Sequence, residues 1–204
     1  MRHLFLYNSP MRRLWGRGDV RLALLLIVLL AVATILYLRT DGLRIGGGII
    51  DRAVPGYYPV VEFIDGDTVS VNMNGSTEIV RMIGVDTPET HRPNTPVQCY
   101  GPVASEYIKK LIGANSVRLE ADPLNTNRDR YGRLLRYIYL ADGTLIESQL
   151  IAGGYGFAYT SFPMTKAQEF EQLEDKAKIA GRGLWSVCEV FVLPNGIKQT
   201  NSQD

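Results

Sequence analysis

Two tight-turn signals near the middle of the chain, Asp65-Gly66 and Asn74-Gly75, separate three short runs of β-branched and apolar residues. The runs cover residues 57–64, 68–73 and 77–83. Asp-Gly and Asn-Gly between such runs are strong hairpin signals, because these residue types tolerate the left-handed backbone of a two-residue turn. The pattern therefore predicts a three-stranded meander that other parts of the chain must cover.

Two further strands and about three helices are predicted after the meander. Residues 117–121 and 134–140 have the apolar and β-branched composition of strands. The helices are predicted to begin at Gly101, at Leu145 and, with the spacing of a capping box, near Thr165. Five strands interrupted and followed by helices suit a small α+β closed barrel of the OB type, with a generic α+β domain as the alternative from pattern alone.

An apolar run near the N-terminus predicts export of the domain that follows. Residues 22–38 form an uninterrupted run of 17 low-polarity residues, and five arginines precede it. This length is at the short end of the range for a transmembrane helix, and the arginines favour an N-terminus on the inside. We therefore expect a basic cytoplasmic segment over 1–21, a membrane anchor over 22–38 and a Gly/Pro-containing linker over 39–56.

A cleavable signal peptide is the alternative interpretation of the same run. Residues 22–30 would then be its apolar region, and Ala31-Val32-Ala33 would be the cleavage site. In either case the domain over residues 57–190 lies outside the membrane, followed by a tail over 191–204 that we expect to be flexible.

The net charge of +1 conceals an uneven distribution. Residues 1–52 carry a net charge of +5, whereas residues 53–204 carry −4. A nucleic-acid-binding domain usually has a basic surface. Any contact of this domain with a polyanion must therefore be local, or must be offset by a bound cation.

Carboxylates and an arginine gather around the predicted turns. Asp65, Asp67, Asp86 and Glu89 lie within 26 residues of chain together with Arg81. Hard cations such as calcium take several oxygen ligands, and the planar fork of arginine suits the oxygens of a phosphodiester. The cluster predicts metal-assisted phosphoryl chemistry, and a pair of acidic surface turns is the alternative.

Several motifs follow one another in a specific order: Asp67-Thr68, Arg81, Asp86-Thr87-Pro88-Glu89, Tyr100-Gly101-Pro102 and Tyr131-Gly132-Arg133. Their order resembles the active-site core of the staphylococcal nuclease (thermonuclease) family over about residues 58–186. The resemblance implies a five-stranded OB-type barrel that uses Ca2+ to hydrolyse DNA and RNA with low sequence specificity and leaves 3′ phosphates.

The same resemblance implies a role for each acidic residue. Asp67 and Asp86 would be carboxylate ligands of calcium, with the backbone carbonyl of Thr87 as a further ligand and water completing the shell. Glu89 would act as the general base or would orient the attacking water. For Asp65 we expect a different task, in which its carboxylate shapes the turn by accepting hydrogen bonds from nearby amides.

Arg81 and Arg133 would bind the scissile phosphate and neutralise the charge that develops on its oxygens, as the resemblance implies. A guanidinium holds two oxygens in register, whereas lysine supplies a single point of charge. Each arginine has a structural alternative: Arg81 on the outer face of a strand, and Arg133 in an ion pair with Asp129 or Glu120.

Two tyrosines are candidates for substrate contacts. Tyr131 would contact a phosphate or pack beside a base, and Tyr159 would stack on a base. The chain departs from the family two residues after Tyr159, where Ser161 replaces a second tyrosine and Phe162 follows. Base stacking is therefore expected to be weaker or rearranged here.

The two cysteines, Cys99 and Cys188, are expected to form a disulfide. Two cysteines in an exported domain are more often joined by a disulfide than free. This pair also resembles pairs of cysteines in bacterial relatives of the family. Closing a loop of about 90 residues adds roughly 4 kcal/mol of stability in the chain-entropy model. Two independent thiols are the alternative.

The sequence favours an enzyme over a binding module. We expect a monomeric catalytic domain without an obligate protein partner, acting on DNA and RNA. The alternatives are a non-catalytic OB-fold module that binds nucleic acid or protein, and a surface module that uses calcium only for structure. Degenerate family members tend to lose the metal-binding acids or the phosphate-binding arginines, whereas this chain keeps both groups.

Overall fold

The structure is a computed structural model that describes residues 17–40, 56–91 and 95–202. It divides into two units, Met1–Ile50 and Asp51–Asp204, which are described separately. Most of the predicted N-terminal segment and linker lies outside the described residues.

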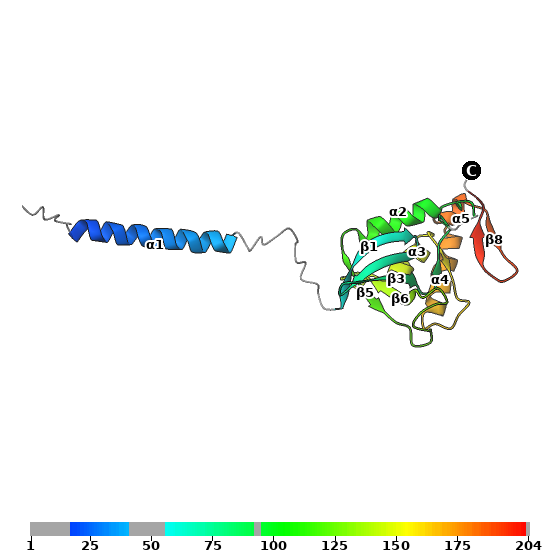
Figure 1. Cartoon of the computed structure of the whole chain (residues 1–204). Helices are drawn as coiled ribbons and strands as arrows, with labels where there is room; N and C mark the ends of the chain where they lie inside the picture. The colour runs from blue at the N-terminus through cyan, green and yellow to red at the C-terminus, as the bar shows by residue number, and fades with distance from the viewer. Residues whose placement is uncertain (1–16, 41–55, 92–94, 203–204) are drawn as a thin grey trace, which may run out of the picture. The chain divides into compact units, whose positions relative to one another are not determined.

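In the described residues of the first unit there is one helix, α1 (Arg17–Thr40), which includes the predicted apolar anchor and appears in blue in Figure 1. The aliphatic side chains described in it are exposed, with Leu30 at 70%. Within residues 17–40, 56–91 and 95–202, no helix combines the length and the apolar character needed to span a membrane.

The second unit is built on a barrel that five of its described strands close in the order β1-β2-β3-β6-β5. Its neighbours pair antiparallel except β3 and β6, which run parallel. The predicted meander and five-stranded α+β barrel are thereby confirmed (Figure 1). The barrel strands are β1 (Tyr57–Asp65), β2 (Thr68–Met73), β3 (Ser76–Met82), β5 (Ser116–Glu120) and β6 (Leu134–Tyr139).

The two turns of the meander form for different reasons. Asn74 and Gly75 both have positive φ, 57° and 95°, as a two-residue Asn-Gly hairpin turn requires. The first turn consists of Gly66 and Asp67, because Asp65 already pairs with Thr68. A Cβ on Gly66 would lie 2.7 Å from the hydroxyl oxygen of Thr87, so glycine lets the chain around Thr87 pack against this turn.

Four helices accompany the barrel in the described residues, rather than the three expected. They are α2 (Gly101–Ile112), α3 (Ile146–Ala152), α4 (Ala167–Ile179) and the four-residue α5 (Leu184–Val187). Their apolar faces and the inner faces of the strands form one core, which is the dominant stabilising contribution. Its fully buried members include Val69, Val71, Val80, Ile108, Ile112, Val117, Ile138, Leu150 and Phe170.

The start of α4 differs from the expected capping box. Thr165 donates from its backbone N–H and its hydroxyl to Asp122, at 2.7 and 2.6 Å, while Lys166 stands at the N-cap position. Tyr137 donates a third hydrogen bond to the same carboxylate, at 2.7 Å. Burial of Asp122 opposes ionisation, but these hydrogen bonds outweigh it and lower the pKa of Asp122. A long-range contact therefore replaces the local cap.

The segment expected to be a flexible tail, residues 191–204, instead contributes to a hairpin. Strands β8 (Val190–Val192) and β9 (Lys198–Thr200) pair antiparallel. The hairpin is fixed to the loop before α2, because the Thr200 hydroxyl and the Cys99 carbonyl form a hydrogen bond of 2.8 Å. The predicted disulfide is confirmed: Cys99 and Cys188 are joined, with their Cα atoms 5.9 Å apart.

Candidate active site

An open cleft of about 1430 Å³ crosses one face of the barrel unit. Its lining combines acids from the first turn and from the loop after β3 with arginines from β3 and from the loop before β6. All predicted catalytic, metal-binding and substrate-binding residues line it: Asp67, Arg81, Asp86, Thr87, Glu89, Tyr131, Arg133 and Tyr159.

The barrel register explains why both arginines line the cleft. Arg81 on β3 pairs with Thr68 on β2, which brings it beside the turn that carries Asp67. On its other side Arg81 pairs with Leu135 in the parallel β3–β6 ladder. Arg133 stands two residues before Leu135, so it lies at the end of the barrel where the cleft opens.

A second, very short ladder positions Asp86. Strand β4 (Val85–Asp86) pairs with β7 (Phe157–Ala158), and Asp86 lies opposite Phe157. The N–H of Tyr159 donates to the carbonyl of Gly84 at 2.9 Å, which continues the contact. Asp86, a predicted metal ligand, and Tyr159, which is predicted to stack on a base, are therefore held by the same two-stranded ladder outside the barrel.

Arg81 joins the two predicted metal ligands. Its guanidinium contacts the Asp67 carboxylate through Nη1 and the Asp86 carboxylate through Nη2, the latter at 2.6 Å. Its neighbours along β3, Val80 and Met82, belong to the core, so Arg81 points away from the core, as its structural alternative foresaw, yet only 13% of its side chain is exposed. Burial by itself lowers the pKa of the guanidinium, but the two facing carboxylates raise it overall. The two acids thus converge on a single centre of positive charge.

Asp67 is held by donors from both sides of the turn. The Thr68 hydroxyl donates to Oδ1 at 2.9 Å, and the Thr87 N–H donates to Oδ2 at 2.9 Å. The hydroxyl oxygen of Thr87 is buried, and within the described residues it has no hydrogen-bond partner. A buried polar atom of this kind calls for a water molecule or an ion nearby.

The donors fit a hard cation that retains water. No group of three or more His, Cys, Asp or Glu side chains in the described ranges is arranged to hold a metal by itself. Two carboxylates, on Asp67 and Asp86, and the backbone at Thr87 provide only oxygen atoms, which calcium and magnesium prefer. Such a set leaves positions for water and for oxygens of a substrate.

Asp65 shapes the turn, as expected, and also reaches further. Its carboxylate accepts hydrogen bonds from the Gly66 N–H at 2.8 Å and from the Thr90 hydroxyl at 2.9 Å. Burial raises the pKa of Asp65, and a hydrogen bond with Glu89 raises it further. Asp65 therefore links the first turn to the loop that carries Glu89, a contact that the sequence analysis did not predict.

Glu89 is positioned by its backbone. Its N–H donates to the side-chain oxygen of Gln98 at 2.8 Å, and its carboxylate accepts a long hydrogen bond of 3.4 Å from the His91 N–H. Gln98 is itself buried and also bridges to Ser202, beyond β9. The proposed base is thus tied to the C-terminal part of the chain.

Arg133 makes the ion pair foreseen as its structural alternative and also lines the cleft. Its Nε donates to Asp129 at 2.7 Å, which fixes the stem of the side chain. Burial opposes ionisation of Asp129, but the hydrogen bonds from Arg133 and from the Tyr131 N–H together outweigh it and lower the pKa of Asp129. Tyr131 stands beside this pair with 69% exposure, and the guanidinium of Arg130 lies 4.8 Å from the centre of its ring.

Phe162 is an exposed aromatic residue of the cleft to which the sequence analysis gave no role. Its ring meets that of Tyr159 edge-on, with centroids 5.9 Å apart, and it is 57% exposed. Ser161, which replaces the family's second tyrosine, lines a smaller pocket beside Tyr159. The only signal in the sequence was the aromatic residue one place after Ser161.

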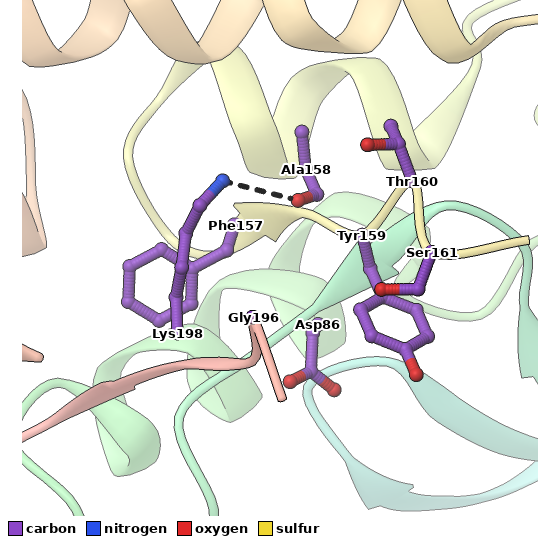
Figure 2. Close-up of a pocket in the computed structure, with 8 residues that line it drawn as sticks. All are labelled: Asp86, Phe157, Ala158, Tyr159, Thr160, Ser161, Gly196 and Lys198. Carbon is purple, nitrogen blue, oxygen red and sulfur yellow. Dashed lines mark hydrogen bonds between the residues drawn. The ribbon is translucent and has the colours of Figure 1, made fainter. Parts of the chain in front are cut away.

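Residues of the β8–β9 hairpin also line the cleft, although the sequence analysis assigned them to a tail. Leu193, Asn195 and Ile197 contribute from its loop, and Lys198 contributes from β9. Figure 2 shows the adjoining pocket, in which Asp86 lies near Gly196 of the hairpin and Tyr159. The signal that could have identified this hairpin is Asn195-Gly196, a further Asn-Gly pair, which follows the apolar residues 190–193.

Comparisons with known proteins agree with this geometry. The family model described as staphylococcal nuclease homologue matches residues 79–187. A thermonuclease of Staphylococcus hyicus is 42% identical over 130 residues, which cover 63% of this chain and 75% of the relative.

Two relatives from Bacillus subtilis (strain 168) are similar over the same share of this chain. The endonuclease YncB is 42% identical over 125 residues, which cover 60% of this chain and 58% of the relative. The SPbeta prophage-derived endonuclease YokF is 41% identical over 125 residues, which cover 60% of this chain and 42% of the relative. The matched region thus spans about half the length of these two Bacillus proteins.

Proposed function

Because this chain belongs to the staphylococcal nuclease family, we propose that it is a calcium-dependent nuclease that hydrolyses DNA and RNA with low sequence specificity. The observation that carries the proposal is the convergence of Asp67 and Asp86 on Arg81, in a cleft that also contains Glu89 and Arg133. A module that only binds nucleic acid has no need to hold two acids against an arginine in a cleft with a second arginine and a further acid.

Asp67 and Asp86 would hold the calcium ion through their carboxylates, with the carbonyl of Thr87 as a third protein oxygen. A bound divalent cation lowers the pKa of water and offsets negative charge on phosphate oxygens. The all-oxygen donor set supports calcium over zinc, which prefers nitrogen and sulfur.

Glu89 would accept the proton of the attacking water, or hold that water in line with the phosphorus atom. The Gln98 contact fixes the backbone from which the Glu89 side chain extends toward the cleft. The new bond forms between the water oxygen and phosphorus, and the bond from phosphorus to the 5′ oxygen breaks. The products would carry a 3′ phosphate and a free 5′ hydroxyl.

Arg81 and Arg133 would bind the non-bridging oxygens of the scissile phosphate. Charge on these oxygens grows as the attacking water approaches, so donors fixed in advance stabilise the transition state more than the ground state. Arg133 is held at Nε by Asp129, and Arg81 is held by Asp67 and Asp86. Both guanidinium groups are therefore placed before substrate binds.

We further propose that the apolar segment over residues 22–38 attaches the protein to a membrane, with the nuclease unit on the outer side. The exposed aliphatic side chains of α1 and the arginines before it support this proposal. The disulfide between Cys99 and Cys188 also supports an oxidising compartment for the second unit.

The test uses the full chain in mild detergent with single-stranded DNA or RNA, in calcium, in magnesium and in chelator. Arg81→Ala and Glu89→Gln are compared with Arg118→Ala and Glu120→Gln. Arg118 and Glu120 form a surface ion pair of 2.7 Å and do not line the cleft, so they are matched controls. We expect cleavage only with a suitable divalent cation, and a loss of about 10²- to 10³-fold in kcat for the two site variants alone.

A folded wild-type protein that cleaves neither substrate with either metal would overturn the proposal. Circular dichroism in the near ultraviolet confirms that each variant is folded. If the wild-type protein binds single-stranded DNA without cleaving it, the non-catalytic OB module becomes the correct description.

A further inference from the structure

The β8–β9 hairpin is an addition to the part of the chain that matches the family model. The match ends at residue 187, and the hairpin begins at Val190. The hairpin is nevertheless fixed to the barrel unit at several points. The Lys198 ammonium group donates to the carboxylate of Glu174 on α4 and, at 3.3 Å, to the carbonyl of Ala158 on β7 (Figure 2).

The loop of this hairpin has an ordered backbone. The Leu193 N–H donates to the carbonyl of Ile197, and the Gly196 N–H donates to the carbonyl of Leu193, both at 2.8 Å. The side-chain oxygen of Asn195 accepts a hydrogen bond of 3.1 Å from the Ile197 N–H. A loop closed in this way loses little entropy when a ligand binds to it.

The loop faces the same cleft as the proposed catalytic residues. Leu193 and Ile197 are half-buried and line the cleft that contains Arg81 and Asp86. The positive charge of Lys198 is balanced by Glu174, so the loop presents apolar side chains and the Asn195 amide to the cleft and no net charge. Its chemistry suits a nucleobase or a sugar better than a phosphate.

A pocket of about 150 Å³ lies where the hairpin approaches Asp86 and Tyr159. Gly196 and Lys198 of the hairpin line it together with Ser161, and Figure 2 shows the carboxylate of Asp86 among them. Sites for drug-sized molecules measure about 300 to 1,000 Å³. The smaller pocket therefore suits one ring-sized group, such as a single base, next to the reacting phosphate.

We propose that the loop over residues 193–197 is a substrate-binding wall, which packs against the base and sugar of the nucleotide beside the scissile phosphate. The proposal rests on the nuclease function and deepens it. By closing the Asp86 side of the cleft, this wall favours a single strand, whose bases are free to turn into the pocket, over a duplex. The loop thus contributes to substrate choice and not to the chemical step.

The test removes the loop and keeps its anchors. Val192 already pairs with Lys198, so deletion of Leu193, Pro194 and Ile197 leaves Asn195-Gly196 as a two-residue hairpin turn between them. A second variant, Leu193→Ser with Ile197→Ser, keeps the length of the loop. Val192→Ala is the control, because Val192 is 68% exposed and does not line the cleft.

The readouts are kcat and KM of the full chain in detergent on single-stranded and double-stranded DNA, over a range of calcium concentrations. We expect KM for single-stranded DNA to rise about 5- to 30-fold in both loop variants, from the loss of two partly buried apolar contacts. We expect kcat and the calcium dependence to stay unchanged, and the preference for single strands to decrease.

Three results would overturn the proposal. An unchanged KM would show that the loop does not touch the substrate. A lower KM or a faster reaction would show that the loop obstructs the cleft. A fall in kcat with a shifted calcium dependence would show that the hairpin acts only by positioning Asp86.

The failure of this proposal is distinguishable from failure of the nuclease function. If the wild-type protein does not cleave at all, the fluorescence anisotropy of a labelled single-stranded oligonucleotide still measures its affinity. Weaker binding by both loop variants than by Val192→Ala then supports the wall, and equal binding refutes it.

Discussion

The disulfide between Cys99 and Cys188 is predicted to stabilise the barrel unit by several kcal/mol, because it constrains the unfolded chain. It closes a loop of 89 residues, for which the chain-entropy relation gives about 4.5 kcal/mol. The Cα separation of 5.9 Å lies within the usual range, so the bond does not require the backbone to move. We therefore expect Cys99→Ala with Cys188→Ala to lower the free energy of unfolding by about 3 to 4.5 kcal/mol.

The assay is urea unfolding of the full chain in detergent, followed by tryptophan fluorescence. Trp185 is a suitable reporter, because its ring packs edge-on against Phe157 with centroids 5.4 Å apart, and Trp15→Phe removes the other tryptophan. With a slope of about 2 kcal/mol per M, the midpoint is expected to fall by about 2 M. The slope itself should increase, since the unfolded chain without the cross-link is more expanded.

The hydrogen bonds around Cys99 provide the control for this reasoning. Those from Thr200 and to Asn201 use backbone atoms of Cys99, so they remain possible in the alanine variant. Wild-type protein treated with reductant should unfold at the same urea concentration as the double variant. A change below about 1 kcal/mol with an unchanged slope would refute the view that the cross-link acts on the unfolded chain.

Three other substitutions test the buried acids and the aromatic edge of the cleft. Asp122→Asn is expected to cost about 1.5 to 3 kcal/mol at pH 7, because hydrogen bonds to the ionised group are lost. Since the folded protein lowers the pKa of Asp122, the difference in free energy of unfolding between the wild-type protein and Asp122→Asn should shrink as the pH falls through that pKa. A difference that stays the same in urea unfolding from pH 7 to pH 3 would contradict this expectation. Burial raises the pKa of Glu147 well above 4.5, so the stability of the wild-type protein should fall as the pH rises above 4.5, whereas Glu147→Gln should lack this loss. If the melting temperatures of the two proteins change in parallel from pH 5 to pH 8, the assignment is wrong. In calcium, Phe162→Ala should weaken the binding of single-stranded DNA about tenfold, whereas Phe191→Ala, outside the cleft, should leave it unchanged. Binding is measured by fluorescence anisotropy in proteins that also carry Glu89→Gln, which suppresses cleavage. Equal affinities of the two variants would exclude a contact between Phe162 and a base.

Local turn chemistry made the barrel predictable from the sequence. Asn74-Gly75 has the positive φ values of a hairpin turn, and the runs on either side pair as expected. The parallel register of β3 and β6 was beyond such reasoning, because Arg81 and Leu135 are separated by 53 intervening residues that carry no local signal for it. That register is what places Arg133 at the cleft.

Competition between local and distant partners explains two of the differences. Thr165 has the spacing of a helix cap, but its hydroxyl binds Asp122, 43 residues earlier in the chain. The strands around Asn195-Gly196 are only three residues long, and contacts with Glu174 and Cys99 stabilise them. The sequence shows the local signal in each case, a cap spacing or an Asn-Gly pair. It does not show the distant contact that competes with that signal or supports it.

The predicted site residues were identifiable because their spacing matches a family, and their geometry follows from the barrel. Asp67, Arg81 and Asp86 meet through a turn and two strands that the sequence indicates separately. Phe162 and the hairpin loop lie outside the matching motifs, so resemblance gave no guidance there. The residues of the cleft that were hardest to predict are therefore those that lie outside the motifs shared with the family.

The order of synthesis gives the hairpin a consequence for the newly made protein. The ribosome adds β8 and β9 after every other described element, and Cys188 emerges long after Cys99. A nascent chain that ends near residue 187 already carries Arg81, Asp86 and Arg133 but lacks one side of the cleft. Because chains fold progressively as they are made, the barrel precedes its last wall in time. On the role that we propose for the loop over residues 193–197, the finished protein would acquire its substrate preference only after translation has passed residue 200.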